Sequence, residues 1–509
     1  MSNPNPPVAA APASRWLRWL ELGALAAYAA FIAVHASTVA GGSDSSGYLN
    51  SARLLASGRL LADLRGPAEF GPPGQVDRLH FFPQGFFPHS TGLQLAPTYP
   101  TGLPLHLALA GKLLGWQAGP LLVEILAAVG AVWLCYRVAR ELGLGVPLAA
   151  AGAAALAGFP VFIFTSIQPL SDTLATTWGL AALYAALRAR RGRGWSAVSG
   201  AALAFAVLVR PTNLLLVPAL LVLLGRDWRR LALFALGGIP GAVWLAAYNH
   251  HLYGNTLRSG YGDDIGAAFA VAYALPAALH FAKWLALLLP AALLPLPFVA
   301  LARRDLRSRE LLALAVAFLA VAGFYVFYEF SHEVWWSLRF ILPVVPALIL
   351  AGLLGVEALA RGPGARWPGH FRPAAALVLV LWAAGNSWYW TKRLAVLMMK
   401  SYEQTYADAS VAARERLPTN ALVVANAFSG AIYFHTGFSV LRWDQIDARG
   451  FARYAALTRQ SGRPVCALLF DAEENEALQI RCPGRWTRLA RVHNAGLWQL
   501  DDDSGAPAR

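Results

Sequence analysis

Long apolar runs alternate with short polar segments from residue 15 to residue 397. Runs of about 15–25 apolar residues can cross the hydrocarbon core of a bilayer as helices. The pattern therefore predicts a polytopic α-helical membrane protein with about 11 transmembrane helices. The predicted spans are residues 16–39, 120–136, 146–164, 173–187, 196–209, 214–225, 231–248, 276–301, 311–330, 340–360 and 373–389.

The loops between these runs differ in charge. Arg clusters lie in alternate loops, the densest at residues 188–193, whereas acidic, aromatic and His residues gather in the others. Because cytoplasmic loops retain positive charge, the N-terminus is predicted to be cytoplasmic and the acidic loops to lie outside. A multi-pass protein of a bacterial-type inner membrane is expected, with anionic lipid headgroups as partners of the Arg clusters.

Composition supports a membrane protein and excludes two other classes. Hydrophobic residues make up 57% of the 509 residues and charged residues only 14%, which is more apolar surface than a soluble globular protein needs. The net charge is +14, but the basic residues follow the loops and form no patch on a soluble face, so no nucleic-acid partner is expected. A transporter is disfavoured because the polar residues gather at one face and no internal repeat is visible.

The two ends of the chain differ from the apolar part. Residues 1–14 are rich in Pro and Ala and are predicted to form a disordered cytoplasmic segment. The apolar run after them is too long for the core of a cleavable signal peptide and has no clear small-residue cleavage site, so it is read as a retained span. Residues 398–502 are predicted to form a small extracytoplasmic α/β domain, followed by a disordered tail at 503–509. Its predicted helices are 401–416, 428–435 and 447–460, and its predicted strands are 421–425, 439–442, 465–470 and 488–492.

The chain has three cysteines. Cys135 lies in an apolar helix, where a thiol is inert. Cys466 and Cys482 lie close together in the polar C-terminal part, and the sequence leaves open whether they pair as a disulfide outside the cytoplasm. His435, Asp444 and Asp471 of the same part are expected to be surface or cap residues.

The first predicted external loop, residues 41–117, is long and contains the first candidate site residue. Amphipathic helices are predicted at 45–57 and 103–114, and the aromatic passage at 79–89 is expected to form a wall at membrane level. Asp44 stands where the first apolar run stops, and an ionised group at the end of a span invites a functional interpretation. The alternative is that Asp44 only caps the N-terminus of helix 45–57.

Other predicted external loops bring further candidates to the same face. Asp172 follows the third span, and Arg210 and Pro211 separate two short apolar runs. Pro211 breaks the helix and frees backbone groups that need a polar cavity. The alternative for Arg210 is that it snorkels to the surface. The remaining candidates for binding are Tyr48, Tyr99, His89, Tyr261, Glu333 and Arg339.

These residue types suit three kinds of protein. A carboxylate can take a proton from an acceptor hydroxyl or amine, and an Arg can hold a phosphate and stabilise its charge as it leaves. Aromatic side chains can contact sugar rings and prenyl chains. Together these residues fit an enzyme that transfers a sugar from a lipid phosphate. They fit equally well a protein that binds or flips a lipid-linked sugar and catalyses no reaction. A third interpretation is a metal-dependent transferase that holds a divalent cation with Asp44, Asp172 and Asp263 or Asp264.

A resemblance to a known family favours the first of these. Asp44-x-x-x-Tyr48, with Arg53 and residues 56–58 downstream, resembles the first-loop motif of the family 39 glycosyltransferases of the GT-C fold. That group includes the protein O-mannosyltransferases and the lipid A aminoarabinose transferases. The likeness runs over about residues 15–400 in matching order. Further similar segments are Tyr99-Pro100 with the helix to Gly115, Asp172, Val209-Arg210-Pro211, residues 249–261 and residues 339–343.

The resemblance implies roles for particular residues. Asp44 would be the catalytic base, Asp172 would orient the acceptor or assist the base, and Arg210 would contact the donor phosphate. The donor would be a sugar on a polyprenyl phosphate, the acceptor a lipid, a protein or a glycan, and the reaction would invert the sugar carbon. It implies no certain cofactor and no metal ligand.

Two segments depart from the family pattern. Ser45 stands where many relatives have Glu, and Thr98 and Tyr99 stand where the aminoarabinose transferases have an acidic residue and Lys. One phosphate-binding cation that the resemblance implies is therefore missing. Either Arg210, Arg339 or His89 substitutes for it, or the donor binds in a different geometry.

Overall fold

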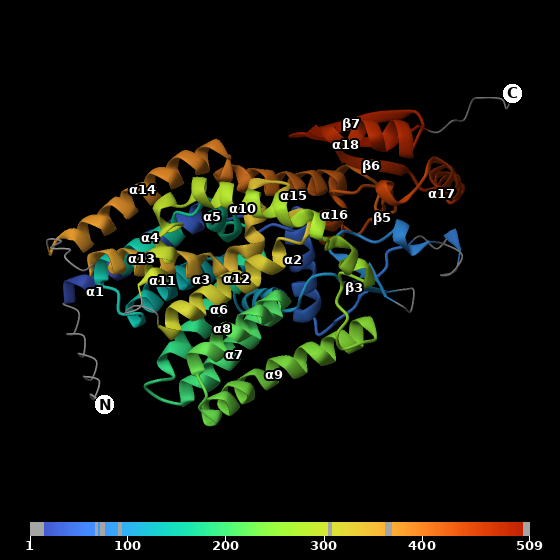
Figure 1. The fold of residues 1–509 in the computed structure, drawn as a ribbon. Coiled ribbons are helices and arrows are strands. Elements are labelled where there is room, and N and C mark those ends of the chain that lie inside the picture. Colours follow the sequence, from blue (N-terminus) through green and yellow to red (C-terminus); the bar gives the residue numbers. More distant parts are fainter. Residues whose placement is uncertain are drawn as a thin grey trace.

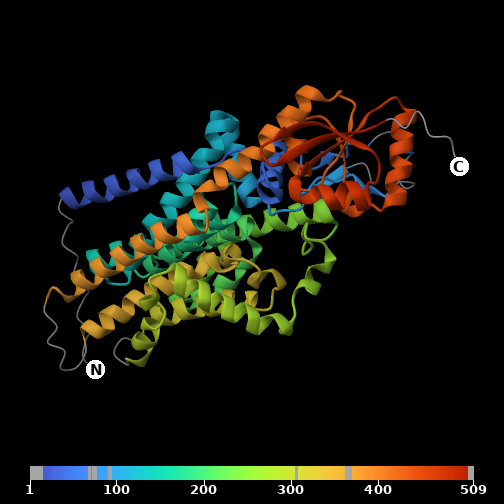
Figure 2. The same ribbon diagram turned by 90° about the horizontal axis from the view of Figure 1, so that it is seen from above.

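The computed structural model describes residues 15–66, 70–71, 77–89, 94–303, 308–361 and 369–501. Figure 1 shows an elongated bundle of helices with a mixed α/β region, residues 399–501, packed at one end; the view from above in Figure 2 shows the same arrangement. The helices of the bundle and its loops are α1 (Arg15–His35), α2 (Ser43–Ala56), α3 (Gly102–Glu141), α4 (Val146–Ala157), α5 (Pro160–Ser166), α6 (Ser171–Arg188), α7 (Gly194–Val209), η3 (Pro211–Leu216), α8 (Val217–Leu224), α9 (Trp228–Tyr253), η4 (Asp263–Ala268), η5 (Val271–Tyr273), α10 (Ala274–Leu288), η6 (Ala291–Leu293), α11 (Leu296–Ala302), α12 (Arg309–Tyr325), η8 (Glu329–His332), η9 (Trp335–Val344), α13 (Val345–Ala360) and α14 (Phe371–Arg393).

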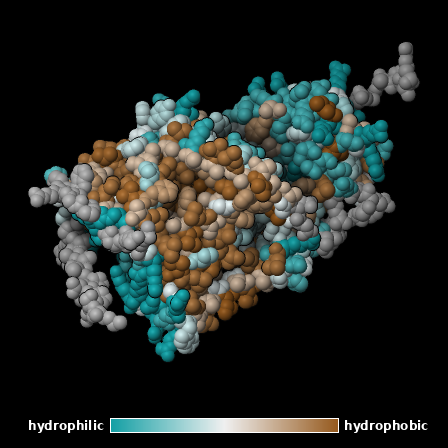
Figure 3. All heavy atoms as spheres, in the orientation of Figure 1, coloured by the Kyte–Doolittle hydropathy of each residue, from teal (hydrophilic) through white to brown (hydrophobic). Residues whose placement is uncertain are grey.

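The prediction of a largely helical membrane protein is confirmed. Within the described residues, four helices are long and apolar enough to cross a bilayer, and a fifth span results if α4 and α5 count as one. The four are residues 102–141, 228–253, 271–288 and 335–360. Figure 3 shows apolar side chains covering the visible flank of the bundle, with polar side chains over the α/β region and at the opposite end.

Several predicted spans are interrupted, and others form apolar helices that are too short to meet these criteria, such as residues 194–209 and 211–224. α4 and α5 meet at an angle of 62°, where Gly158 and Pro160 interrupt the predicted span 146–164. The predicted span 276–301 divides into α10, η6 and α11 at Pro290 and Pro295. Two elements predicted as separate, 103–114 and 120–136, form the single 40-residue segment α3, bent at Gly115, whose φ is 81°.

Glycines let neighbouring helices approach closely in the bundle, as is common where helices pack in membranes. α7 crosses α9 at Gly200, where an added Cβ would lie within 2.9 Å of the Phe234 carbonyl carbon. Gly237 approaches Ala197 of α7 in the same way. Cys135 is buried in the core of the bundle, as expected.

The long first loop is more ordered than its sequence suggested. It contains α2 and an antiparallel sheet in the order β1-β3-β2, which the sequence analysis did not predict. The aromatic passage at 79–89 does not form a wall at membrane level: Phe81 is buried against Phe70 and Tyr454, in a core shared with the α/β region. Strand β3 is followed directly by the residues that lead into α3. The elements here are β1 (Ala62–Asp63), η2 (Arg78–His80), β2 (Phe86–Pro88) and β3 (Gln94–Pro97).

The α/β region is built on a five-stranded mixed sheet in the order β5-β4-β6-β8-β7. Strands β5, β4 and β6 are parallel, and β8 and β7 are antiparallel to their neighbours. The last strand, β8, was missed by the sequence analysis. Cys466 and Cys482 lie in different hydrophobic cores and are free thiols, so they form no disulfide here. The elements are η10 (Val396–Met398), α15 (Met399–Arg416), β4 (Leu422–Val424), α16 (Ser429–His435), β5 (Ser439–Leu441), η11 (Trp443–Gln445), α17 (Ala448–Gln460), β6 (Val465–Phe470), α18 (Asp471–Glu474), the π-helix η12 (Asn475–Arg481), β7 (Trp486–Val492) and β8 (Ala495–Leu500).

Candidate functional site

Asp44 lies in the first turn of α2 and does not cap it. The helix begins at Ser43, its N-cap residue is Gly42, and no side chain caps it. The alternative interpretation of Asp44 as an N-cap is therefore wrong. A carboxylate in the first turn is stabilised by the helix dipole, yet its oxygens remain free to meet other partners.

The main partner of Asp44 is Arg339, which comes from η9 about 295 positions further along the chain. Arg339 Nη1 donates a hydrogen bond of 2.7 Å to Asp44 Oδ2. Burial raises the pKa of Asp44, but the Arg339 guanidinium and a hydrogen bond from Tyr99 outweigh burial and hold that pKa below its ordinary value. Asp44 is therefore an ionised, 29% exposed carboxylate held in place by a cation that is 18% exposed.

A second ion pair joins Asp172 and Arg210. Asp172 lies at the start of α6 and its side chain is almost fully buried, and Arg210 donates to its Oδ1. Arg210 also donates a 3.3 Å hydrogen bond to the carbonyl oxygen of Arg339, so the two ion pairs are adjacent. Since the Arg210 side chain is only 13% exposed and is paired, it does not snorkel to the surface.

Arg210 takes this position because the chain breaks there. α7 ends at Val209, Arg210 is extended, and Pro211 opens the 3₁₀ turn η3. The Ala206 carbonyl accepts its helical hydrogen bond from the Arg210 amide at 2.9 Å and a second hydrogen bond from the Asn213 side chain at 3.1 Å. Asn213 thus supplies a buried polar side chain beside Pro211, where a polar surrounding was predicted.

The two ion pairs face one cavity of about 630 Å³. Eight of the nine candidate residues line it: Asp44, Tyr48, Tyr99, Asp172, Arg210, Tyr261, Glu333 and Arg339. His89 does not; it lies at the end of β2, where its backbone bonds to Gln94. Of the three cations considered as replacements at the phosphate site, Arg210 and Arg339 therefore face the cavity and His89 does not.

One wall of the cavity is aromatic, and the sequence analysis missed most of it. Phe340 stacks on Tyr325 with ring centroids 5.3 Å apart and meets Tyr328 edge to face. The Tyr325 hydroxyl lies 3.0 Å from Thr212 Oγ1, next to the Arg210 break. The signal that was available is the density of aromatic residues at 324–330 and 335–340, on both sides of the acidic segment that contains Glu333.

Tyr99 and Tyr48 form a second group beside Asp44. Their rings lie 4.8 Å apart, and the Tyr99 hydroxyl lies 2.9 Å from Ser43 Oγ. Burial and the Asp44 charge raise the pKa of Tyr99 well above its ordinary value. Tyr99 thus stays protonated and can donate a hydrogen bond to the carboxylate.

The proposed metal ligands do not gather in the described part of the chain. Asp44 and Asp172 are each held by an Arg, and within the described residues no three His, Cys, Asp or Glu side chains form a group that fits a metal ion. The side chains of Asp263 and Asp264 lie outside the described part. Dependence on a divalent cation stays a prediction that a chelator can test.

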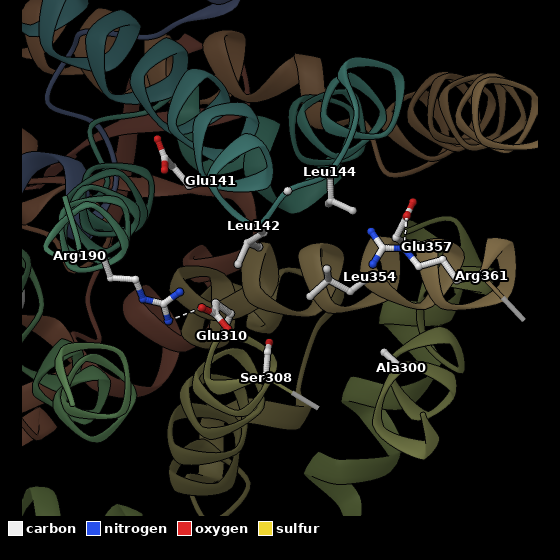
Figure 4. Close-up of a pocket in the computed structure, with 11 residues that line it drawn as sticks. Glu141, Leu142, Leu144, Arg190, Ala300, Ser308, Glu310, Leu354, Glu357 and Arg361 are labelled. Atoms are coloured by element: carbon white, nitrogen blue, oxygen red, sulfur yellow. Dashed lines mark hydrogen bonds and ion pairs between the residues drawn. The ribbon is translucent and has the colours of Figure 1, made fainter. Parts of the chain in front are cut away.

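The opposite end of the bundle has a charged cleft of about 350 Å³, shown in Figure 4. Glu141 lies 2.8 Å from Arg191, and Glu357 lies 2.7 Å from Arg361 and from Arg372. Figure 4 also shows Glu310 pointing to Arg190. These charged residues lie at or near helix ends. None of the nine candidate residues is among those that line this cleft. We call this the far end, and the end with Asp44 the site end.

The fold and this site can be compared with known proteins. ArnT from Cupriavidus metallidurans, solved with bound undecaprenyl phosphate, matches 98% of this chain and 100% of its own with a TM-score of 0.61 at 15% identity. The chain has the GT-C fold. Residues 97–261 match the model of the dolichyl-phosphate-mannose-protein mannosyltransferase family. This segment contains Tyr99, Asp172, Arg210 and Tyr261, so the resemblance seen in the sequence is confirmed.

Two further solved structures share the fold. The arabinofuranosyltransferase AftD from Mycobacteria matches 97% of this chain and 40% of its own, with a TM-score of 0.53 at 15% identity. The oligosaccharyltransferase of Archaeoglobus fulgidus in its apo form matches 91% of this chain and 71% of its own, with a TM-score of 0.52 at 13% identity. No curated protein sequence matches the chain.

Proposed function

We propose that this GT-C chain is a membrane glycosyltransferase that moves a sugar from a polyprenyl phosphate to an acceptor. The observation that carries the proposal is the pair of carboxylate–guanidinium contacts, Asp44–Arg339 and Asp172–Arg210, facing one cavity with an aromatic wall. The undecaprenyl phosphate bound to the ArnT of matching fold supports the class of donor. The acceptor would be a lipid, a protein or a glycan.

In this proposal Asp44 is the base. The acceptor hydroxyl or amine loses its proton to Asp44 as it attacks the anomeric carbon, and the bond from that carbon to the phosphate oxygen breaks on the opposite face. The phosphate keeps the bonding electrons, and the sugar carbon is inverted. Arg339 and Arg210 then stabilise the phosphate that leaves.

The Arg339 contact gives the donor a way to activate the base. In the free protein Arg339 lowers the pKa of Asp44, which makes it a weaker base. A donor phosphate competes for the same guanidinium, and an Asp44 carboxylate relieved of that contact binds a proton more readily. Asp172 keeps Arg210 directed into the cavity, and Tyr48, Tyr99, Tyr261 and Glu333 contact the substrates.

The proposed setting follows the charge pattern. The site end faces the outside of a bacterial-type inner membrane, the far end with its Arg residues faces the cytoplasm, and about 11 segments cross, several as broken helices. Residues 398–502 then form an extracytoplasmic domain above the cavity.

The test is transfer of labelled sugar from polyprenyl-phosphate donors in membranes with the native chain, Asp44→Asn or Asp63→Asn. Asp63 is an exposed carboxylate of the same loop and serves as the matched control. Product with the native chain and the Asp63 variant, and none with Asp44→Asn at equal expression, supports the proposal. Product from Asp44→Asn at the native rate contradicts the role of Asp44.

A second function is favoured by the same pairs. The two Asp and the two Arg residues of the site already neutralise one another, so the cavity can hold a lipid-linked sugar without performing chemistry, as in a binding or flipping protein. It predicts donor binding, no product with any donor sugar, and unchanged binding in Asp44→Asn.

A further inference from the structure

The helix that carries Asp44 packs against the α/β region on the side away from the cavity. His435 Nε2 lies 3.3 Å from the carbonyl of Ala40, just before α2, and the Asn50 amide donates a 3.1 Å hydrogen bond to Gly430 O. Arg53 donates to the carbonyl of Phe434 at 2.9 Å. Three positions along or before α2 are therefore bound to α16. Figure 2 shows these two parts of the chain side by side.

A buried carboxylate from α15 reaches the start of α2. Glu403 is 8% exposed, and it accepts a 2.5 Å hydrogen bond from Ser45 Oγ and a 3.3 Å hydrogen bond from the Gly42 amide. Ser45 Oγ in turn accepts a 3.2 Å hydrogen bond from the Gly41 amide. The Glu403 carboxylate thus binds Gly42, which precedes Asp44 in the sequence, and Ser45, which follows it.

Glycine at position 41 makes this approach possible. A Cβ added there would lie 2.3 Å from Glu403 Oε2 and 2.7 Å from its carboxyl carbon. A side chain at this position would therefore push the carboxylate away from Ser45. The φ of Gly41 lies outside the left-handed region, so the space for Glu403, and not the backbone conformation, requires glycine here.

The Glu403 carboxylate is held between opposing influences on its pKa. Burial and the nearby Asp44 charge raise the pKa of Glu403 to about 6, and the hydrogen bonds from Ser45 and Gly42 act to lower it. A charge-assisted hydrogen bond is about twice as strong as a neutral one, and a buried carboxylate without its donors would be costly. The contact therefore fixes the chain on both sides of Asp44 firmly.

We propose that Glu403 is a positioning residue of the site: it sets the first turn of α2 so that the Asp44 carboxylate points at Arg339 and the acceptor. This inference rests on the proposed transfer reaction. It assigns the α/β region a role in holding the base, through a residue that does not line the cavity. A misplacement of about 1 Å can cost a reaction a factor of about 100.

The experiment measures kcat and the donor KM for the native chain, Glu403→Gln and Glu403→Ala. Glu403→Gln keeps the shape and loses the charge, and we expect kcat to fall about tenfold with an unchanged donor KM. Glu403→Ala leaves the Gly42 amide without this acceptor, and we expect a loss of about a hundredfold in kcat. The matched control is Glu415→Gln, an exposed carboxylate on the same helix, which should behave as the native chain.

A second variant perturbs the contact from the other side. Gly41→Ala leaves the Glu403 charge in place but displaces its carboxylate, so it should lower kcat as Glu403→Gln does. Thermal unfolding in detergent is measured for every variant, and it shows whether a loss of kcat follows from loss of folded protein. If Glu403→Ala does not fold, Glu403→Gln and Gly41→Ala decide the outcome.

The outcomes separate this inference from the proposed reaction. No product from the native chain with any donor overturns the reaction and the inference with it. An active native chain whose Glu403→Gln and Gly41→Ala variants keep kcat within twofold overturns the inference alone. It is also overturned if the donor KM rises at unchanged kcat, or if kcat falls only in proportion to the folded fraction.

Discussion

The site end and the far end of the bundle use the same two kinds of charged group in different surroundings. At the far end, three of the four Arg partners of Glu141 and Glu357 are at least 40% exposed: Arg191 is 62%, Arg361 is 53% and Arg372 is 41% exposed, whereas Arg188 is 25% exposed. At the site end, Arg210 and Arg339 are 13% and 18% exposed. The far-end pairs close helix termini, whereas the site pairs lie beside an aromatic cavity that can receive a substrate.

The difference in exposure gives the pairs different energetic roles. Exposed ion pairs contribute about 0–1 kcal/mol, because water screens them and two long side chains must be ordered. A buried pair contributes little net stability but becomes costly when one partner is removed. A buried pair beside a cavity is therefore a better candidate for function than an exposed one.

The largest expected effect is on activity. Asp44→Asn keeps the size of the side chain and removes the base, so transfer should fall roughly 10²–10⁴-fold. Glu357→Gln at the far end should change transfer less than about twofold, because Glu357 does not line the cavity and its partners Arg361 and Arg372 are 53% and 41% exposed. The transfer rates of the two variants are measured in membranes with equal expression. Equal losses of transfer would contradict the view that the site end performs the reaction and the far end does not.

The second effect is on stability. Arg210→Met leaves Asp172 buried without its cation, which should destabilise the fold by roughly 3–5 kcal/mol. Arg191→Met at the far end should cost about 1 kcal/mol or less. Unfolding of both variants in detergent measures the difference. Arg210→Met with Asp172→Leu should recover much of the loss, and no recovery would mean that Arg210 stabilises through other contacts.

The sequence indicated which residues line the cavity better than it indicated the fold around them. Asp44, Asp172 and Arg210 could be found because a charge or a Pro interrupts an apolar run, and such an interruption is visible locally. The pairing of Asp44 with Arg339 joins residues 295 positions apart and depends on how η9 packs. Glu403 was missed for the same reason: in sequence it is one carboxylate of an amphipathic helix.

The broken spans show the same limit. Hydropathy predicts that residues 146–164 are apolar enough to cross, and it does not predict the 62° bend between α4 and α5. His89 was included among the candidates because it lies in an aromatic loop, but that loop turns toward the α/β region. Short strands such as β1 and β3 have too few residues for an alternating pattern to be recognised.

The third effect is a shift in pH dependence. Burial alone raises the pKa of Asp44, and Arg339 is the main group that lowers it. In Arg339→Gln the pKa of Asp44 should therefore rise, so the base is protonated at a higher pH and the acidic limb of the profile of kcat/KM moves upward. In the native protein, the midpoint of the acidic limb should lie below the ordinary pKa of an Asp side chain. A variant whose limb does not move would show that Asp44 is not the titrating base.

The smallest expected effect comes from one hydroxyl. Tyr99→Phe keeps the ring that packs on Tyr48 and removes the hydrogen bonds to Asp44 and Ser43. A hydrogen bond to a charged group contributes about 1.5–3 kcal/mol, so kcat/KM should fall roughly tenfold, and the acidic limb should move upward by less than in Arg339→Gln. Tyr402→Phe, at a half-exposed ring on α15, is the matched control and should leave both quantities unchanged. Because Tyr99 and Arg339 bind the same carboxylate, the double variant should lose less than the product of the two single losses. If the loss of kcat/KM in the double variant equals the product of the two single losses, Tyr99 acts on the substrate and not through Asp44.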